Sequence, residues 1–126
     1  MKKDVSSTIK RAETFIEKEN ICEREFEMAG EFWHLFTDGT KMEDIFLSEE
    51  EFELGETLLA VSCCKMPQIR VLTFELMTNH LHVIPNGSKE DCLILFDDYK
   101  KRLKRAFQKR GRSINWNNFP ADILPI

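Results

Sequence analysis

Several features that would assign this chain to a common class are missing. No apolar run approaches the roughly 20 residues that a membrane-spanning helix needs. The first residues, Met1 to Asp4, lead into a polar segment instead of the apolar stretch of a signal peptide. The four cysteines lack the paired spacing of a zinc site. These absences argue against a membrane protein or a zinc module and predict a cytoplasmic protein.

A net positive charge is missing as well. The 126-residue chain has a formal charge of −4 at pH 7, whereas nucleic-acid-binding domains are usually basic overall. The charges are distributed unevenly, because acidic residues dominate from 13 to 56 and eight Lys or Arg residues fall within the thirteen positions 100–112. A molecule polarised in this way can hold a polyanion on one face and repel it from the other.

The basic segment is predicted to lie on one helix and to contact phosphate groups. The alternative is a solvated helix face that is balanced by the acidic helices. The candidate DNA-binding residues are Lys100, Lys101, Arg102, Lys104, Arg105, Lys109 and Arg110.

Capping and turn signals divide the chain into elements. Ser48 and Ser88 each begin a capping box, with an acidic residue three positions later, and so mark the starts of two helices. The patterns predict a helix in the first 20 residues, a strand at 30–36, a helix at 48–66, strands at 70–77 and 80–85, and a helix at 88–110.

This order predicts an α+β fold with a ferredoxin-like antiparallel sheet, helices on one of its faces and an additional N-terminal helix. Residues 1–30 form an N-terminal helical extension in this interpretation, and residues 31–126 form the domain. The strand at 70–77 is expected to be buried on both faces. The segment 114–126 carries no recognisable closing strand and resembles an exposed tail, which favours a truncated chain.

Two histidines, His80 and His82, flank Leu81 at the start of an apolar run. Side chains two apart on a strand share a face, so both imidazoles can approach one divalent ion while Leu81 turns into the core. A bare His-x-His is a weak motif, and the alternative is a pair of ordinary strand residues. His34 and Glu75 are further candidates if their strands bring them to the ion.

The segment Leu76 to Val83, with the order Met-x-Asn-His-hydrophobic-His, resembles the IS200-like transposase family, including the transposases associated with repetitive extragenic palindromes. Two neighbouring features fit the resemblance. The stretch Phe32 to Gly39 is similar to the family's opening strand, an aromatic-His-hydrophobic run closed by a glycine turn, and a basic helix follows the histidine strand. The resemblance covers roughly residues 32–111.

The resemblance implies an enzyme that binds single-stranded or hairpin DNA and that nicks and rejoins it. His80 and His82 would hold Mg²⁺ or Mn²⁺ to polarise the scissile phosphate, and a tyrosine on a later helix would attack it. The only tyrosine here, Tyr99, lies in the preceding helix and is expected to pack or to stack on DNA. The chain is therefore predicted to hold a metal site without its nucleophile, and a homodimer is left open.

Two other interpretations remain at this point. One is a catalytically inactive nucleic-acid-binding module in which only the basic helix functions. The other is a ferredoxin-like protein-interaction domain that uses the acidic region 43–56 as its contact face.

Overall fold

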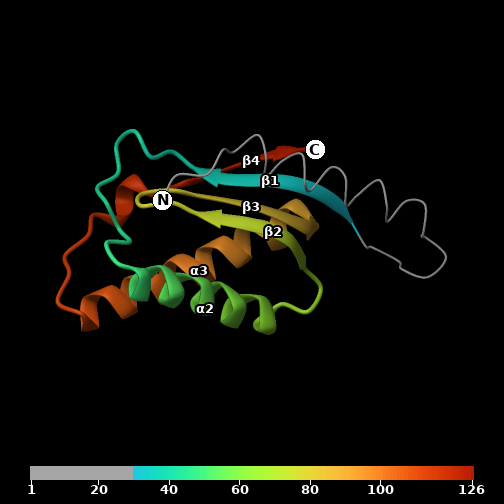
Figure 1. The fold of residues 1–126 in the computed structure, drawn as a ribbon. Coiled ribbons are helices and arrows are strands. Elements are labelled where there is room, and N and C mark those ends of the chain that lie inside the picture. Colours follow the sequence, from blue (N-terminus) through green and yellow to red (C-terminus); the bar gives the residue numbers. More distant parts are fainter. Residues whose placement is uncertain (1–29) are drawn as a thin grey trace.

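The computed structural model describes residues 30–126 (Figure 1), so the predicted N-terminal helix lies outside the described residues. The described chain forms four strands and two long helices in the order βαββαβ. Its elements are β1 (Glu31–Thr37), α2 (Glu49–Lys65), β2 (Arg70–Leu76), β3 (Leu81–Gly87), α3 (Lys89–Lys109), a short 3-10 helix η1 (Trp116–Asn118) and β4 (Ala121–Pro125). Neither long helix is both long and apolar enough to cross a membrane.

The strands form one antiparallel sheet in the spatial order β2-β3-β1-β4. Both long helices cover the same face of this sheet, as Figure 1 shows. This arrangement confirms the predicted α+β fold with a ferredoxin-like antiparallel sheet and helices on one face.

The expected lack of a closing strand was wrong, because Ala121–Pro125 forms β4 and pairs with β1 from Trp33↔Pro125 to Thr37↔Ala121. Pro120 precedes this short strand and Pro125 ends it, and neither can donate a ladder hydrogen bond. The segment before it is not an exposed tail either. Trp116 is 8% exposed and Phe119 is fully buried in the core.

The burial of the strands also differs from the prediction. Strand β2 lies at an edge of the described sheet and is mostly half-buried, whereas every residue of β3 is buried. A strand in the interior of a sheet is covered by neighbours on both sides, and β3 takes that place between β2 and β1. The run of apolar residues in β2 therefore did not indicate a central strand.

The main core lies between the sheet and the two helices. Leu35, Leu81 and Val83 point from the sheet into this core, where they join Leu103 and Phe107 of α3. The N-caps predicted for both helices are confirmed, since the Ser48 hydroxyl accepts a hydrogen bond from the Glu51 amide and the Ser88 hydroxyl accepts one from the Asp91 amide. The Glu51 carboxylate reaches back to the amide of Leu47, one residue before the N-cap.

The loop from β1 to α2 is irregular but firmly held. The amides of Ile45 and Phe46 donate hydrogen bonds to the Thr78 carbonyl, at 2.6 and 3.0 Å, in the connection between β2 and β3. Both side chains are buried in the core. The loop therefore has a fixed position beside the start of β3, where the two candidate histidines lie.

Candidate functional site

His80 and His82 lie together at the beginning of β3, as their spacing predicts. Their ring centroids are 5.5 Å apart and their planes are nearly perpendicular. Leu81, between them, is fully buried in the core below the sheet. Because side chains alternate along a strand, the two imidazoles share the face of the sheet opposite to α2 and α3 (Figure 1).

Asn79 fixes the orientation of His80. The Asn79 side-chain nitrogen donates hydrogen bonds to the carbonyls of Gly39 and Met42, at 2.9 and 3.0 Å. Its oxygen consequently faces His80 Nδ1, 2.8 Å away, and that ring nitrogen must be the donor. In the neutral ring the lone pair then lies on Nε2. In metal sites, a hydrogen bond from the other ring nitrogen to a neighbouring group commonly orients a histidine ligand in this way.

Gly39 allows this contact by having no side chain. A Cβ atom at this position would lie 2.6 Å from Asn79 Oδ1 and 2.7 Å from His80 Nδ1. Real Cβ atoms are not found so close to other heavy atoms, and a larger residue would displace the amide, the imidazole or the loop. The glycine of the opening turn is therefore part of the support for His80.

His34 contacts His82 directly. The Nε2 atom of His34 lies 2.8 Å from Nδ1 of His82, and the two rings stack with centroids 5.0 Å apart. Burial lowers the pKa of His82 to about 4, and the charges that His34 and His80 can carry act in the same direction. His82 is therefore a neutral imidazole near pH 7, which is the protonation state that binds metals.

A hollow of about 760 Å³ opens beside the histidines, and we call it the histidine pocket. It is built from the ends of β1 and β4, the loop after β1 and the start of β3. The polar and aromatic residues that line it include Phe36, Asp38, Asp44, Asn79, His80, His82 and Asp122. Its volume falls within the range of about 300–1,000 Å³ that is typical of ligand pockets.

The pocket offers two histidines as possible metal ligands and no complete set of protein ligands among the described residues. Within residues 30–126, no group of three or more His, Cys, Asp or Glu side chains is arranged to hold a metal ion. Glu75, the candidate carboxylate, is 4% exposed and lies opposite His82 in the register of β2 and β3. A hard ion such as Mg²⁺ commonly keeps waters and takes phosphate oxygens as further ligands, so two protein donors fit a site that the substrate completes.

Tyr99 is a core residue, as its place in the apolar stripe predicts. It is 1% exposed, and its hydroxyl donates a hydrogen bond to the Gly55 carbonyl at 3.0 Å. Burial raises its pKa far above the usual value. An attacking phenolate is therefore disfavoured at this position.

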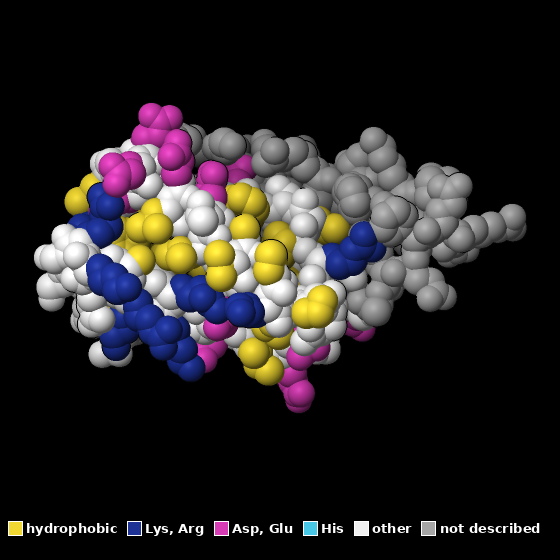
Figure 2. All heavy atoms as spheres, turned by 90° about the horizontal axis from the view of Figure 1, so that it is seen from below, with side chains coloured by type: hydrophobic (Ala, Val, Ile, Leu, Met, Phe, Trp, Pro, Cys, Tyr) yellow, Lys and Arg dark blue, Asp and Glu magenta, His cyan; other side chains and the backbone are white. Residues whose placement is uncertain are grey.

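The basic residues lie on α3 or at its C-cap, in the helix layer. Figure 2 views this side of the molecule, where dark blue Lys and Arg side chains gather over one end and no histidine comes into view. Figure 1 places the C-terminal end of α3 at the same end of the molecule as the connection from β2 to β3. The cations and the histidine pocket thus share one end but lie on opposite layers.

Three of the seven candidate cations are paired with carboxylates. Lys101 and Arg102 bind Asp97 and Asp98 one turn earlier in α3, at 3.1 and 2.8 Å. Arg110 binds Glu50 and Glu51 of α2, at 3.0 and 3.2 Å. The other four, which have no ion pair within the described part of the chain, are Lys100, Lys104, Arg105 and Lys109.

Sequence reasoning missed Phe36 and Asp122 as pocket residues. Phe36 had a signal, since it follows His34 by two positions and so shares its face of the strand. Asp122 had none, because it reaches the pocket only through the pairing of β4 with β1, where it lies opposite Phe36.

Comparisons with known proteins bear on the fold. No protein-family model matches the chain, and no curated protein matches it significantly. A protein from Deinococcus radiodurans, provisionally assigned as a transposase, has a similar crystal structure with a TM-score of 0.57 and 15% identity over 75% of this chain and 78% of that chain. A REP-associated tyrosine transposase bound to a REP hairpin has a TM-score of 0.58 and 12% identity over 80% of this chain and 59% of that chain.

These similarities show that the chain has a transposase-like fold. They agree with the resemblance to the IS200-like family that the His80 segment carries. The chain spans less than two thirds of the hairpin-bound transposase.

Proposed function

We propose that this chain is a transposase-like DNA-binding domain that binds single-stranded or hairpin DNA and holds one backbone phosphate at the histidine pocket. The observation that carries the proposal is the hydrogen-bonded chain from the Gly39 and Met42 carbonyls through Asn79 to His80. These hydrogen bonds make Nδ1 of His80 a donor, so that Nε2 is the ring nitrogen that would bind a metal ion at the pocket.

Each residue of the pocket has a role in this proposal. His80 and His82 would hold Mg²⁺ or Mn²⁺, and the bound ion would supply the positive charge that polarises a phosphate ester. Asn79 orients His80, and His34 orients His82 through the 2.8 Å contact between their ring nitrogens. The neutral state of His82, favoured by its low pKa, keeps the pair ready to bind.

The α3 cations that have no described ion pair provide the second part of the binding surface. Exposed Lys and Arg side chains contact phosphates and release counterions, which makes the affinity for DNA depend on salt. Lys104, Arg105 and Lys109 lie in the C-terminal half of α3, at the end of the molecule that carries the pocket. A strand that reaches the pocket can therefore continue around this end onto α3.

Nicking and rejoining of DNA require a nucleophile, and Tyr99 is unsuited to that role. Its hydroxyl is engaged with the Gly55 carbonyl inside the core. This observation favours a second candidate function, a nucleic-acid-binding module that carries out no covalent chemistry of its own. The two candidates make the same prediction for hairpin binding and differ in whether His80 and His82 bind a metal ion.

The test is fluorescence anisotropy of a labelled hairpin oligonucleotide and a matched duplex, at two salt concentrations, with and without Mn²⁺. We expect tighter, salt-sensitive binding to the hairpin, and an increase in affinity with Mn²⁺ that His80→Ala abolishes. Glu53→Gln, an exposed change on α2, is the matched control and should behave as wild type.

Two other outcomes would reject parts of the proposal. Hairpin binding that is the same for wild type and His80→Ala at all Mn²⁺ concentrations would leave the binding module without a metal. Absence of binding to both DNAs would reject DNA binding and favour a protein partner for the acidic residues at the start of α2.

A further inference from the structure

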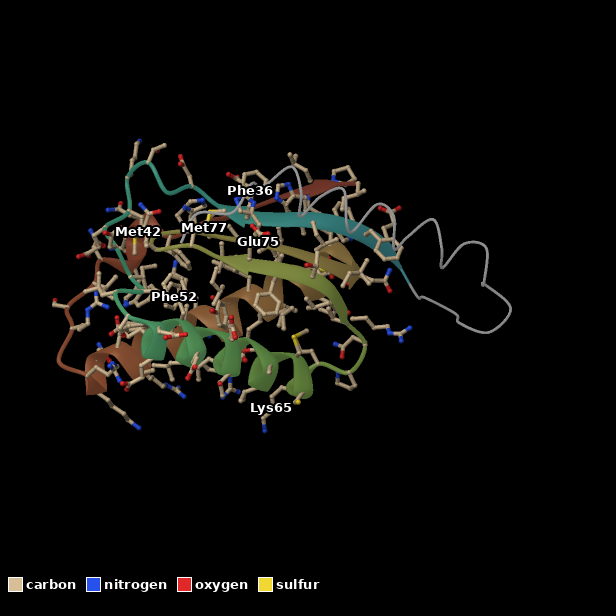
Figure 3. All side chains as sticks on the ribbon, in the orientation of Figure 1. Phe36, Met42, Phe52, Lys65, Glu75 and Met77 are labelled. Atoms are coloured by element: carbon tan, nitrogen blue, oxygen red, sulfur yellow. The ribbon has the colours of Figure 1, made fainter. Side chains whose placement is uncertain are left out.

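Three rings lie side by side on the face of the sheet opposite to α2 and α3. Phe36 stacks on His34 with ring centroids 4.6 Å apart and an interplanar angle of 29°. It also lies nearly parallel to His82, at 6.0 Å and 16°. Figure 3 shows Phe36 on the side of the sheet away from the two helices, whereas Phe52 points from α2 toward the sheet. Phe36 is half-buried and lines the histidine pocket.

The register places Phe36 in a row that crosses the whole sheet. Glu75 lies opposite His82, His82 opposite Phe36, and Phe36 opposite Asp122. Directly opposed residues of antiparallel strands share a face, and neighbouring strands are about 4.8 Å apart. Phe36 therefore has His82 on one flank and Asp122 on the other. The second flank is the part of the pocket next to β4.

That part of the pocket carries the carboxylate of Asp122, which lies opposite Phe36. Asp38 and Asp44 also line the pocket, and Asp38 is near enough to His80 for their charges to interact. The Thr40 amide, donating a hydrogen bond to Asp38, holds the pKa of that carboxyl below its usual value, so Asp38 is ionised near neutral pH. Carboxylates repel a phosphate but accept hydrogen bonds from the amino and imino groups of a nucleobase. The flank of Phe36 next to Asp122 is thus suited to a base.

We propose that Phe36 is a stacking platform for one unpaired nucleobase, whose neighbouring phosphate reaches His80 and His82. This inference rests on the proposed function and names the part of the DNA that the pocket takes. Proteins that bind single-stranded nucleic acids commonly stack bases on aromatic side chains of an exposed sheet face. A base can stack on Phe36 only if it is unpaired. The protein should therefore bind a hairpin with an unpaired flank more tightly than a continuous duplex.

The test compares three labelled DNAs. The first is a hairpin with a blunt stem, the second carries a single-stranded flank of four nucleotides, and the third has the same flank with abasic sites. Wild type should bind the flanked hairpin roughly tenfold more tightly than the blunt one, in keeping with the usual contribution of one stacked base. The abasic flank should lose most of that gain.

Variants then locate the gain at Phe36. The quantity compared is the ratio of the affinities for the flanked and the blunt hairpin. Phe36→Leu should bring this ratio close to one, whereas Phe36→Trp, which keeps an aromatic face, should retain the wild-type ratio. Phe74→Leu is the matched control, because Phe74 is also partly exposed, at 36%, but lies on edge strand β2 beside a different hollow. The melting temperature of each variant checks that it folds, and the abasic DNA tests the same point without any variant.

The failures can be told apart. If wild type binds the blunt and flanked hairpins equally, the stacking proposal is overturned and the proposed function stands. A flank-dependent gain that survives in both Phe36→Leu and the abasic DNA also overturns it. If wild type binds none of the DNAs, the proposed function fails and the inference fails with it.

Discussion

The histidine pocket and the basic helix both follow from short sequence patterns, yet the structure uses their polar groups differently. In the pocket, the interactions of Asn79 and His34 orient two rings toward an open hollow. On α3, several cations instead bind carboxylates of the same molecule. A motif at fixed spacing specifies a geometry, whereas a run of charges specifies only a composition. Internal pairing decides how many of those charges are available to a partner.

The largest effect on stability is expected at Arg112. Its guanidinium donates hydrogen bonds to the carbonyls of Ile45 and Asp44 and binds Glu51, whose side chain is 5% exposed. Arg112→Met removes one of the positive charges beside the buried Glu51 carboxylate. It also removes the hydrogen bonds that hold the loop beside the pocket. We expect a loss of about 3 kcal/mol in the free energy of unfolding, measured by urea denaturation.

Lys104→Met is the matched control for Arg112→Met, since it removes one charge from the same end of the molecule. Its exposed side chain makes no ion pair among the described residues, so the free energy of unfolding should change by less than about 0.5 kcal/mol. Equal losses in the two variants would contradict the distinction between cations that hold the fold and cations that face a partner.

Gly39→Ala is expected to have the next largest effect, this time on the pocket. The added methyl group would lie 2.7 Å from His80 Nδ1 and displace either the imidazole or Asn79. We expect a loss of about 2 kcal/mol in stability, as for other overpacked sites, together with loss of any stabilisation by Mn²⁺. Thermal unfolding with and without Mn²⁺ measures both.

Lys41→Ala, an exposed change in the same loop, is the control for Gly39→Ala. It should keep the wild-type response to Mn²⁺. If Gly39→Ala also keeps that response, the support of His80 by Asn79 does not matter for metal binding.

Tyr99→Phe should have a smaller effect and separates packing from chemistry. The change removes the hydrogen bond to the Gly55 carbonyl and keeps the ring in the core. We expect a loss of about 1 kcal/mol in stability and unchanged affinity for the hairpin in the anisotropy assay. A covalent protein–DNA adduct that wild type forms and Tyr99→Phe does not would show that the tyrosine leaves the core and reacts.

The elements that local chemistry determines could be predicted from the sequence. Capping boxes at Ser48 and Ser88 marked the starts of α2 and α3, because the groups that they satisfy lie within one turn. The proximity of His80 and His82 followed from strand alternation, which needs no knowledge of the rest of the fold.

Features that depend on distant parts of the chain could not be predicted. Strand β4 is only five residues long and is defined by its pairing with β1. The contact between His34 and His82 joins residues 48 positions apart, and the ion pair of Arg110 with Glu50 joins residues 60 apart. Such contacts form only when the sheet and the helices pack together. The sequence therefore indicated candidate site residues but not the residues that they contact.

The smallest effect on folding, but a distinct one on binding, is expected from neutralising the cations without a described ion pair. Replacing Lys104, Arg105 and Lys109 with Gln should reduce the slope of log affinity against log salt by about 0.9 for each lost phosphate contact. The matched control neutralises Lys101, Arg102 and Arg110, which removes the same charge from side chains that bind carboxylates.

The two triple variants separate total charge from available charge. If only the total matters, both will flatten the salt dependence of hairpin binding equally, because long-range attraction depends on the summed charge. If the ion pairs limit what the DNA can contact, the first variant will flatten it more. We expect the second result, since a cation held by a carboxylate must give up that partner before it can release a counterion from DNA.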